Sequence, residues 1–167
     1  MDEWEIETPG QPGEDIQNWA KYCTKIEGAS FIRFSIACGS EAYFALGDTE
    51  EAKPKRIVWY FAGYGNCINA PHWMEKDDYD NEFGDPHGQY AYSEPNSLYG
   101  TGMPRWFEVN WNVEGKDGMI ELSCIKNEEG EGKKVWSTFP KKDFLLNYFM
   151  VVTGYNQRGI WKMHSYK

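Results

Sequence analysis

The sequence predicts an all-β fold, an antiparallel β-sandwich of jelly-roll-like topology with one long structured loop. Three observations support this. Short segments that alternate apolar and polar residues recur from Phe31 almost to the C-terminus, with Gly-, Asn- or Pro-rich turns between them. A period of two residues is typical of a strand with one buried and one solvated face. No segment has a sustained helical period, and aromatic residues, which favour sheets, make up 17% of the chain.

Strands are expected along most of the chain. Residues 4–8 alternate before a proline and predict a short edge strand. Residues 26–38 predict a strand, and the turn at 39–40 joins it to a partner strand at 41–46, which indicates a hairpin. The continuous apolar run 56–62 predicts a central strand that is buried on both faces.

The long loop is expected between residues 67 and 104, because this segment lacks a periodicity of its own and is rich in Asp, Asn, Gly, Pro and Tyr. We expect it to fold over one end of the sheets. Further strands are predicted at 105–113, 118–126 and 144–153, and residues 159–164 close the chain. Residues 127–134 are expected to form a turn.

Composition limits the classes of partner. The 167 residues suit a single domain, residues 1–167. Net charge is -9, with 26 acidic against 17 basic residues, so nucleic acid and anionic membrane surfaces are disfavoured. No apolar stretch is long enough to span a bilayer. The acidic N-terminus lacks the apolar core of a signal peptide, so we expect a cytoplasmic protein if this N-terminus is native and a secreted one if a leader was removed.

Four cysteines occur, and none of them forms a CxxC pair, so a zinc or thioredoxin-type site is not expected. Cys38 and Cys124 share the parity of core-facing residues in their strands, which predicts two buried thiols. The alternative is a disulfide between them, which would imply an oxidising compartment. A Cys23–Cys67 disulfide is also left open.

Short motifs occur in one order between about Trp19 and Met163. They are residues 31–37, 41–46, 63–66, 106–111, 118–120, Trp136, 153–155 and 159–161. With these motifs the chain resembles the farnesoic acid O-methyltransferase-like domain of arthropods and other invertebrates. The resemblance implies methyl transfer from S-adenosylmethionine to a sesquiterpenoid acid. The residues themselves do not indicate that chemistry, because Gly63-Tyr64-Gly65 follows a strand but precedes no amphipathic helix and fits a turn.

An aromatic site is the first candidate for function. Trp106 lies on the polar face of its predicted strand, with Glu108 and Asn110 at alternate positions. An exposed Trp beside amides and a carboxylate is typical of sugar binding, because the ring stacks on C–H faces while polar groups bond hydroxyls. The alternative is that the long loop covers this face and makes Trp106 ordinary core. The predicted ligand-binding residues are Trp106, Glu108, Asn110, Trp73, His72, Tyr79 and Tyr90.

A metal site is the second candidate. Asp77, Asp78, Asp80 and Glu82 fall within one turn-rich stretch, and oxygen ligands at this density could hold Ca²⁺. The spacing is not that of an EF-hand, because Phe83 stands where its glycine would be. The alternative is a solvated acidic loop that needs no cofactor.

Catalysis has little support in the sequence, because no carboxylate pair and no nucleophile beside a base is marked out. No catalytic residue is therefore assigned. We expect a non-catalytic, lectin-like module that binds a glycan or another small ligand. Two alternatives remain: an S-adenosylmethionine-dependent farnesoic acid O-methyltransferase, and a structural or self-associating protein that forms a homo-oligomer.

Overall fold

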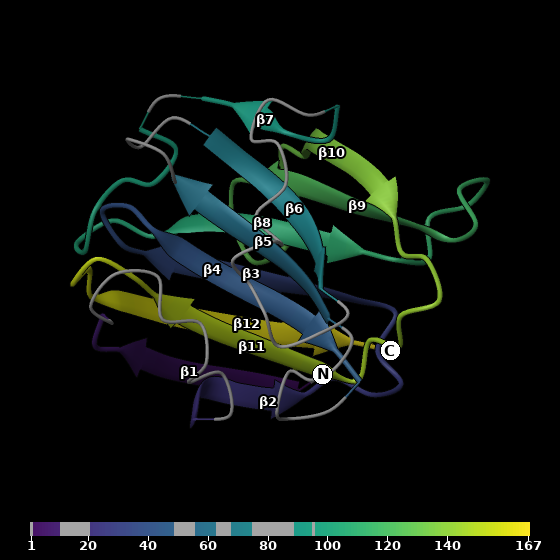
Figure 1. Ribbon diagram of the computed structural model, residues 1–167, viewed down its shortest axis with the longest axis horizontal. Helices are drawn as coiled ribbons and strands as arrows, with labels where there is room; N and C mark the ends of the chain where they lie inside the picture. The colour runs from purple at the N-terminus through teal and green to yellow at the C-terminus, as the bar shows by residue number, and fades with distance from the viewer. Residues whose placement is uncertain (1, 11–20, 49–55, 63–67, 75–88, 95) are drawn as a thin grey trace.

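The computed structural model describes residues 2–10, 21–48, 56–62, 68–74, 89–94 and 96–167. The described residues form two six-stranded antiparallel sheets packed face to face (Figure 1), which confirms the predicted β-sandwich. Sheet A has the order β1-β12-β3-β8-β9-β10, and sheet B has the order β2-β11-β4-β5-β6-β7. The strands are β1 (Asp2–Thr8), β2 (Cys23–Lys25), β3 (Phe31–Ala37), β4 (Ala42–Gly47), β5 (Arg56–Ala62), β6 (Ile68–Met74), β7 (Tyr92–Ser93), β8 (Arg105–Asn110), β9 (Met119–Ile125), β10 (Lys134–Pro140), β11 (Tyr148–Thr153) and β12 (Gly159–Tyr166).

The core lies between the sheets and is centred on Phe34 of β3, which is fully buried. The ring of Phe34 packs against five aromatic rings from strands of both sheets, at centroid distances of 5.1 to 6.0 Å. They belong to Phe44, Phe61, Phe107, Phe149 and Trp161. Aromatic side chains bury large areas and have preferred packing angles, so this cluster holds the two sheets at a fixed separation.

Strand β5 is buried along its whole length, as its apolar run predicts. Trp59 and Phe61 face the core between the sheets. Val58 and Tyr60 point the other way, into a second buried cluster on the outer face of sheet B. The N-terminal strand is also confirmed, because β1 lies at the edge of sheet A and pairs with β12. Within the described residues, no helix has the length and apolarity needed to cross a membrane.

The predicted hairpin is wrong. Strand β3 pairs with β12 and β8 in sheet A, whereas β4 pairs with β11 and β5 in sheet B. The turn at residues 39–40 therefore carries the chain from one sheet to the other. The strand predicted from residue 26 begins at residue 31, because Ile26 accepts a turn hydrogen bond from the amide of Ala29 (2.9 Å).

The predicted long loop contains strand β6 and the short strand β7. Pro71 lies inside β6 and obscures the strand pattern. Strand β7 pairs with β6 at Ile68 and Asn69, and among the described residues no strand pairs with Pro71 on that side. A proline is tolerated where a strand needs no amide donor on its outer side.

Strand β10 was not expected, because residues 127–134 predict only a turn and the next predicted strand starts at 144. The reason is a β-bulge between Val135 and Ser137. The bulge shifts the alternation, so that Trp136 and Phe139, three residues apart, both enter the core. A strict period of two does not detect such a strand.

Cys38 and Cys124 carry free thiols, so the alternative of a disulfide between them is wrong. Cys38 follows β3 and Cys124 belongs to β9, and β8 lies between these strands. The distance across two strand spacings is greater than the Cα–Cα distance that a disulfide can bridge. Burial raises the pKa of the Cys38 thiol to about 11, so it stays protonated at neutral pH. Cys67 lies outside the described residues, and the Cys23–Cys67 alternative stays a prediction.

Replacing the central ring tests the core. We expect Phe34→Ala to lower the free energy of unfolding by about 3–5 kcal/mol, because it leaves a cavity among rings that cannot collapse together. Phe31→Ala is the matched control, since Phe31 lies on the outer side of the same strand, where its ring stacks on Tyr166 and lies 5.0 Å from the Arg33 guanidinium. We expect it to cost about 1 kcal/mol. Urea unfolding measures both, and equal losses would contradict this description of the core.

Candidate ligand-binding site

The outer face of sheet A is crossed by rows of side chains from successive strands. Strand register places one residue of each strand opposite its neighbour, and such pairs lie within contact distance. The central row consists of Glu3, His164, Arg33, Glu108, Ser123 and Val135. The next row contains Lys162, Ser35, Trp106 and Ile125. Polar and charged groups therefore gather on this face, as the alternation of strand β8 predicts.

Glu108 does not stand open to solvent. Its carboxylate accepts from Arg33 (Nε to Oε2, 2.9 Å) and from Lys133 (Nζ to Oε1, 3.0 Å). Lys133 also reaches Glu121 (3.0 Å), and Lys116 contacts the other oxygen of Glu121 (3.0 Å). Glu108 and Glu121 are each only 5% exposed. The predicted ligand-binding residue Glu108 therefore belongs to a neutralised ion-pair network.

The ion pairs set the ionisation of Glu121. Burial alone would raise its pKa, but hydrogen bonds from Lys116 and Lys133 outweigh this, and the pKa lies below its ordinary value of 4.5. Burial also tends to lower the pKa of Lys133, yet the carboxylates of Glu121 and Glu108 raise it above its ordinary value. Glu121 and Lys133 are therefore both charged at neutral pH.

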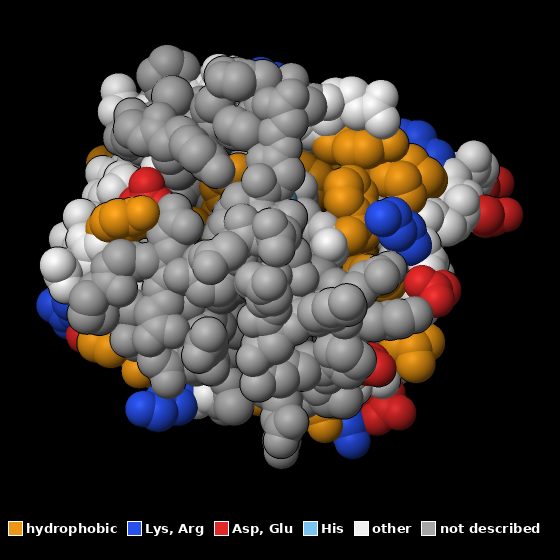
Figure 2. Space-filling view, viewed as in Figure 1, with side chains coloured by type: hydrophobic (Ala, Val, Ile, Leu, Met, Phe, Trp, Pro, Cys, Tyr) orange, Lys and Arg blue, Asp and Glu red, His pale blue; other side chains and the backbone are white. Residues whose placement is uncertain are grey.

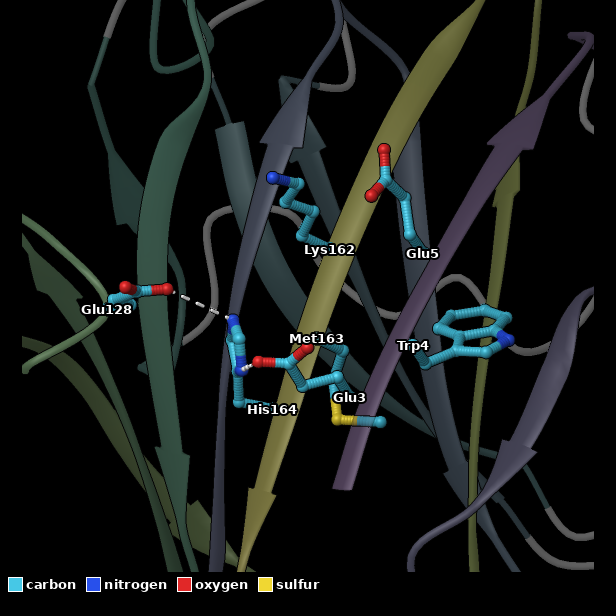
Figure 3. A pocket seen from close by; sticks show the side chains of 7 residues that line it. All are labelled: Glu3, Trp4, Glu5, Glu128, Lys162, Met163 and His164. Atoms are coloured by element: carbon cyan, nitrogen blue, oxygen red, sulfur yellow. Dashed lines mark ion pairs between the residues drawn. The ribbon is translucent and has the colours of Figure 1, made fainter. Parts of the chain in front are cut away.

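The loop between β9 and β10 covers the central row. The carbonyl oxygen of Glu128 accepts from Arg33 (Nη1, 3.1 Å) and from the Tyr166 hydroxyl (3.3 Å). The Glu128 carboxylate lies 3.3 Å from His164, whose other ring nitrogen is 3.3 Å from Glu3, and Figure 3 shows the imidazole between the two carboxylates. Gly130 has φ +80°, and a Cβ there would lie 2.6 Å from the Arg33 guanidinium. Only glycine lets the loop approach this closely.

A hollow of about 390 Å³ opens beside this loop, where β8 begins and β9 ends. We call it the Trp106 hollow. Its lining includes Glu94, Tyr99, Arg105, Trp106, Lys126 and Lys134. These residues come from β8 and β10, from the residue that follows β9 and from the segment that precedes β8, so they are distant in sequence and adjacent in the fold.

Arg105 fixes one wall of the Trp106 hollow. Its guanidinium pairs with the Glu94 carboxylate and donates to the carbonyl of Ser97 (2.7 Å). The same guanidinium lies 4.9 Å from the ring centres of both Tyr99 and Trp136. The Arg105 side chain is 11% exposed, and ion pairs and cation–π contacts gain strength when water is excluded. Arg105 thus ties Glu94, Ser97 and Tyr99 to the start of β8.

Trp106 is one of the aromatic residues that line the hollow. Its ring stacks on His164 at 5.9 Å with an interplanar angle of 25°, and it remains partly exposed. The alternative that Trp106 is ordinary core does not hold, because its neighbour Phe107 faces the core and Trp106 points outward. Tyr99 contributes a second ring, which is 53% exposed. Asn110, also predicted as a ligand residue, lies near the far end of β8, where its side chain accepts from the amide of Asn112 (2.8 Å).

Trp73 does not share this hollow. Its indole donates to the carbonyl of Pro140 (2.7 Å) and packs edge-on against Phe139 (6.1 Å) and Tyr90 (5.5 Å). Pro140 is the last residue of β10, whereas Lys134 of the Trp106 hollow is the first. Six residues of strand separate them, roughly 20 Å. In Figure 2, hydrophobic side chains gather at the upper right of the view, over the region where Figure 1 draws β10.

The remaining predicted residues lie elsewhere. His72 is buried on the outer face of sheet B, where it stacks on Tyr60 at 4.8 Å. Tyr79 and the predicted metal ligands Asp77, Asp78, Asp80 and Glu82 lie outside the described residues. Within the described ranges, no group of three or more His, Cys, Asp or Glu side chains is placed to hold a metal ion.

Comparisons with known proteins place this site in context. No protein-family model matches the sequence, and no curated protein matches it. Among solved structures, the crystal structure of Caenorhabditis elegans galectin LEC-6 matches with a TM-score of 0.48 and 10% sequence identity, over 99% of this chain and 96% of that chain. A likeness at this level transfers no ligand or activity. The resemblance to the farnesoic acid O-methyltransferase-like domain stays a prediction.

Four side chains of the candidate site were not predicted from the sequence: Tyr99, Arg105, Lys126 and Lys134. Arg105 directly precedes Trp106, and a cation beside an aromatic residue at a strand start is a signal that could have found it. Tyr99 stands in a segment without periodicity. Lys134 opens the unexpected strand β10, so nothing in the sequence places it near Trp106.

The Glu121 network gives a pH-dependent prediction. At pH 7 we expect Glu121→Gln to lower the free energy of unfolding by about 1–2 kcal/mol, because Lys116 and Lys133 lose a buried partner. The folded pKa of Glu121 lies below 4.5, so this stabilisation is present above pH 4.5 and is lost as the pH falls through the folded pKa.

The gap between wild type and Glu121→Gln should therefore narrow below pH 4.5 in urea unfolding measured across pH. Glu114→Gln, at an exposed position outside the recorded ion pairs of the described residues, is the control and should change little. A gap that stays constant from pH 7 to pH 3 would be incompatible with a lowered pKa.

Proposed function

We propose that this protein is a non-catalytic β-sandwich module that binds carbohydrate in the Trp106 hollow. The observation that carries the proposal is the pairing of two outward aromatic rings, Trp106 and Tyr99, with the polar groups of Glu94 and Arg105 in one concave site. Sugars present C–H faces that stack on aromatic rings and hydroxyls that bond to charged or amide groups. Both kinds of contact are available within this hollow.

The size and rigidity of the hollow support the proposal. Its volume of about 390 Å³ falls in the range of small-ligand sites, roughly 300–1,000 Å³. Arg105 is held by Glu94 and Ser97, and Trp106 is held by His164, so two binding side chains are already ordered. Ordering these groups in advance reduces the entropic cost of binding.

Binding here requires no cofactor and no bond-making step. The proposal departs from the set of residues predicted from the sequence: Trp106 is retained, whereas Glu108 is neutralised by Arg33 and Lys133. A role of Trp73 in ligand binding stays a prediction, and it would need a second site near the end of β10.

Truncation of Trp106 tests the proposal. A glycan array identifies a binding sugar, and tryptophan fluorescence then gives its Kd. We expect Trp106→Ala to weaken that binding by roughly fivefold or more, since an aromatic contact contributes about 1 kcal/mol. Trp106→Phe should retain most of the affinity, because it keeps a stacking face.

Two further variants complete the test. Tyr99→Ala should weaken binding in the same direction, whereas Trp73→Phe should leave it unchanged. Thermal unfolding of each variant checks that the fold is intact. A flat response to every sugar class, or a loss of binding confined to Trp73→Phe, would refute the assignment to the Trp106 hollow.

A further inference from the structure

We infer that the Trp106 hollow selects saccharides that carry an anionic group, a carboxylate or a sulfate, over neutral ones. This inference rests on the proposed function and goes beyond it, because it names the class of sugar. It follows from the charges that line the hollow and from the partners those charges have.

The hollow is cationic in an acidic protein. Arg105, Lys126 and Lys134 line it against one carboxylate, Glu94, although the chain carries a net charge of -9. Two neighbouring hollows among the described residues of this face have the opposite balance of charge. One, of about 330 Å³, is lined by Glu3, Glu5, Glu128, Lys162 and His164 (Figure 3). The other, of about 370 Å³, is lined by Glu3, Glu128, Glu129, Arg33 and His164.

The single carboxylate among the described lining residues of the hollow already forms an ion pair. Glu94 pairs with the guanidinium of Arg105, so these two charges offset each other. The two lysines then leave the hollow with an excess of positive charge. An anion that enters it meets no uncompensated carboxylate among the described lining residues.

Both lysines have chemistry that suits a ligand anion. The Lys134 ammonium donates to the hydroxyl of Tyr92 (2.9 Å), and this hydrogen bond orders the lysine side chain. The aliphatic stem of Lys126 packs against Gly132, where a Cβ would lie 2.7 Å from it. Lys126 as a whole is exposed, and a lysine commonly packs its aliphatic stem while its ammonium group stays in water. Within the described ranges, neither lysine forms an ion pair.

The aromatic rings explain why a sugar, rather than a bare anion, is the expected ligand. Trp106 and Tyr99 offer apolar faces next to the two ammonium groups, and an inorganic anion uses neither face. The net negative charge of the protein does not cancel the preference. At physiological ionic strength charges are screened beyond about 8 Å, so the lysines within the hollow dominate there.

Matched ligands test the inference. The probes are a trisaccharide of galacturonic acid, its neutral methyl ester, and a 6-sulfated galactose trisaccharide, each titrated by calorimetry at 0.15 M salt. We expect the two anionic probes to bind at least roughly tenfold more tightly than the methyl ester. Lys126→Gln and Lys134→Gln should each weaken the anionic probes by roughly two- to fivefold and leave the ester unchanged.

A matched control separates local from overall charge. The double variant Lys126→Gln with Lys134→Gln is compared with Lys162→Gln with Lys167→Gln, which removes the same charge from exposed positions that do not line the hollow. Only the first pair should lose the preference for the anionic probes. Raising the salt to 0.5 M should also reduce that preference.

The outcomes are distinguishable. Equal binding of ester and anionic probes, with a loss on Trp106→Ala, would overturn this inference and leave the proposed function standing. Equal losses in both double variants would overturn it too, because the effect would then be one of net charge. Failure of these probes and of every glycan on the array to bind would overturn both. Competition by inorganic sulfate or acetate at the Kd of the sugar would refute the need for a saccharide.

Discussion

The contact of Phe34 with aromatic rings from both sheets sets the geometry on which everything else depends. Once Phe34 faces inward, its neighbours Arg33 and Ser35 must face outward, since successive residues of a strand point to opposite sides. The register of β3 with β8 then places Glu108 opposite Arg33 and Trp106 opposite Ser35. A slip of one residue would send Trp106 into the core and Phe107 into solvent, at the cost of the buried aromatic cluster.

The outer face of sheet A is divided into two regions by the β9–β10 loop. Beneath the loop, Arg33 and the buried carboxylates Glu108 and Glu121 form a set of ion pairs with Lys133 of the loop itself, and these ion pairs stabilise the fold. Beside it, the Trp106 hollow keeps aromatic faces and lysine ammonium groups available. Gly130 makes this division possible, because its close approach to Arg33 lets the loop lie low over the central row. The same sheet thus carries both a rigid ion-pair network and the proposed binding surface.

The two-residue alternation predicts the sandwich, the edge strand β1 and the place of Trp106 on the polar face of its strand, whereas a continuous apolar run predicts the buried strand β5. The alternation failed where a local feature broke the pattern, as with Pro71 in β6 and the bulge at Val135 in β10. The alternation also failed where consecutive strands lie in different sheets. The turn after β3 crosses to the other sheet instead of closing a hairpin. The set of residues that line the Trp106 hollow could not be predicted from the alternation either. Lys134 and Tyr99 line one hollow because contacts with Arg105 hold the segment that precedes β8 in place. These are tertiary contacts, which leave no periodic pattern in the sequence.

Nuclear magnetic resonance of ¹⁵N-labelled protein can show whether a saccharide occupies the Trp106 hollow. On titration with the galacturonic acid trisaccharide, the account predicts saturable shifts of the Trp106 indole N–H and of the amides of Tyr99, Arg105, Lys126 and Lys134. The indole resonances of Trp59 and Trp73 should stay in place. Shifts centred on Trp73, or saturable binding without any change at Trp106, would contradict it.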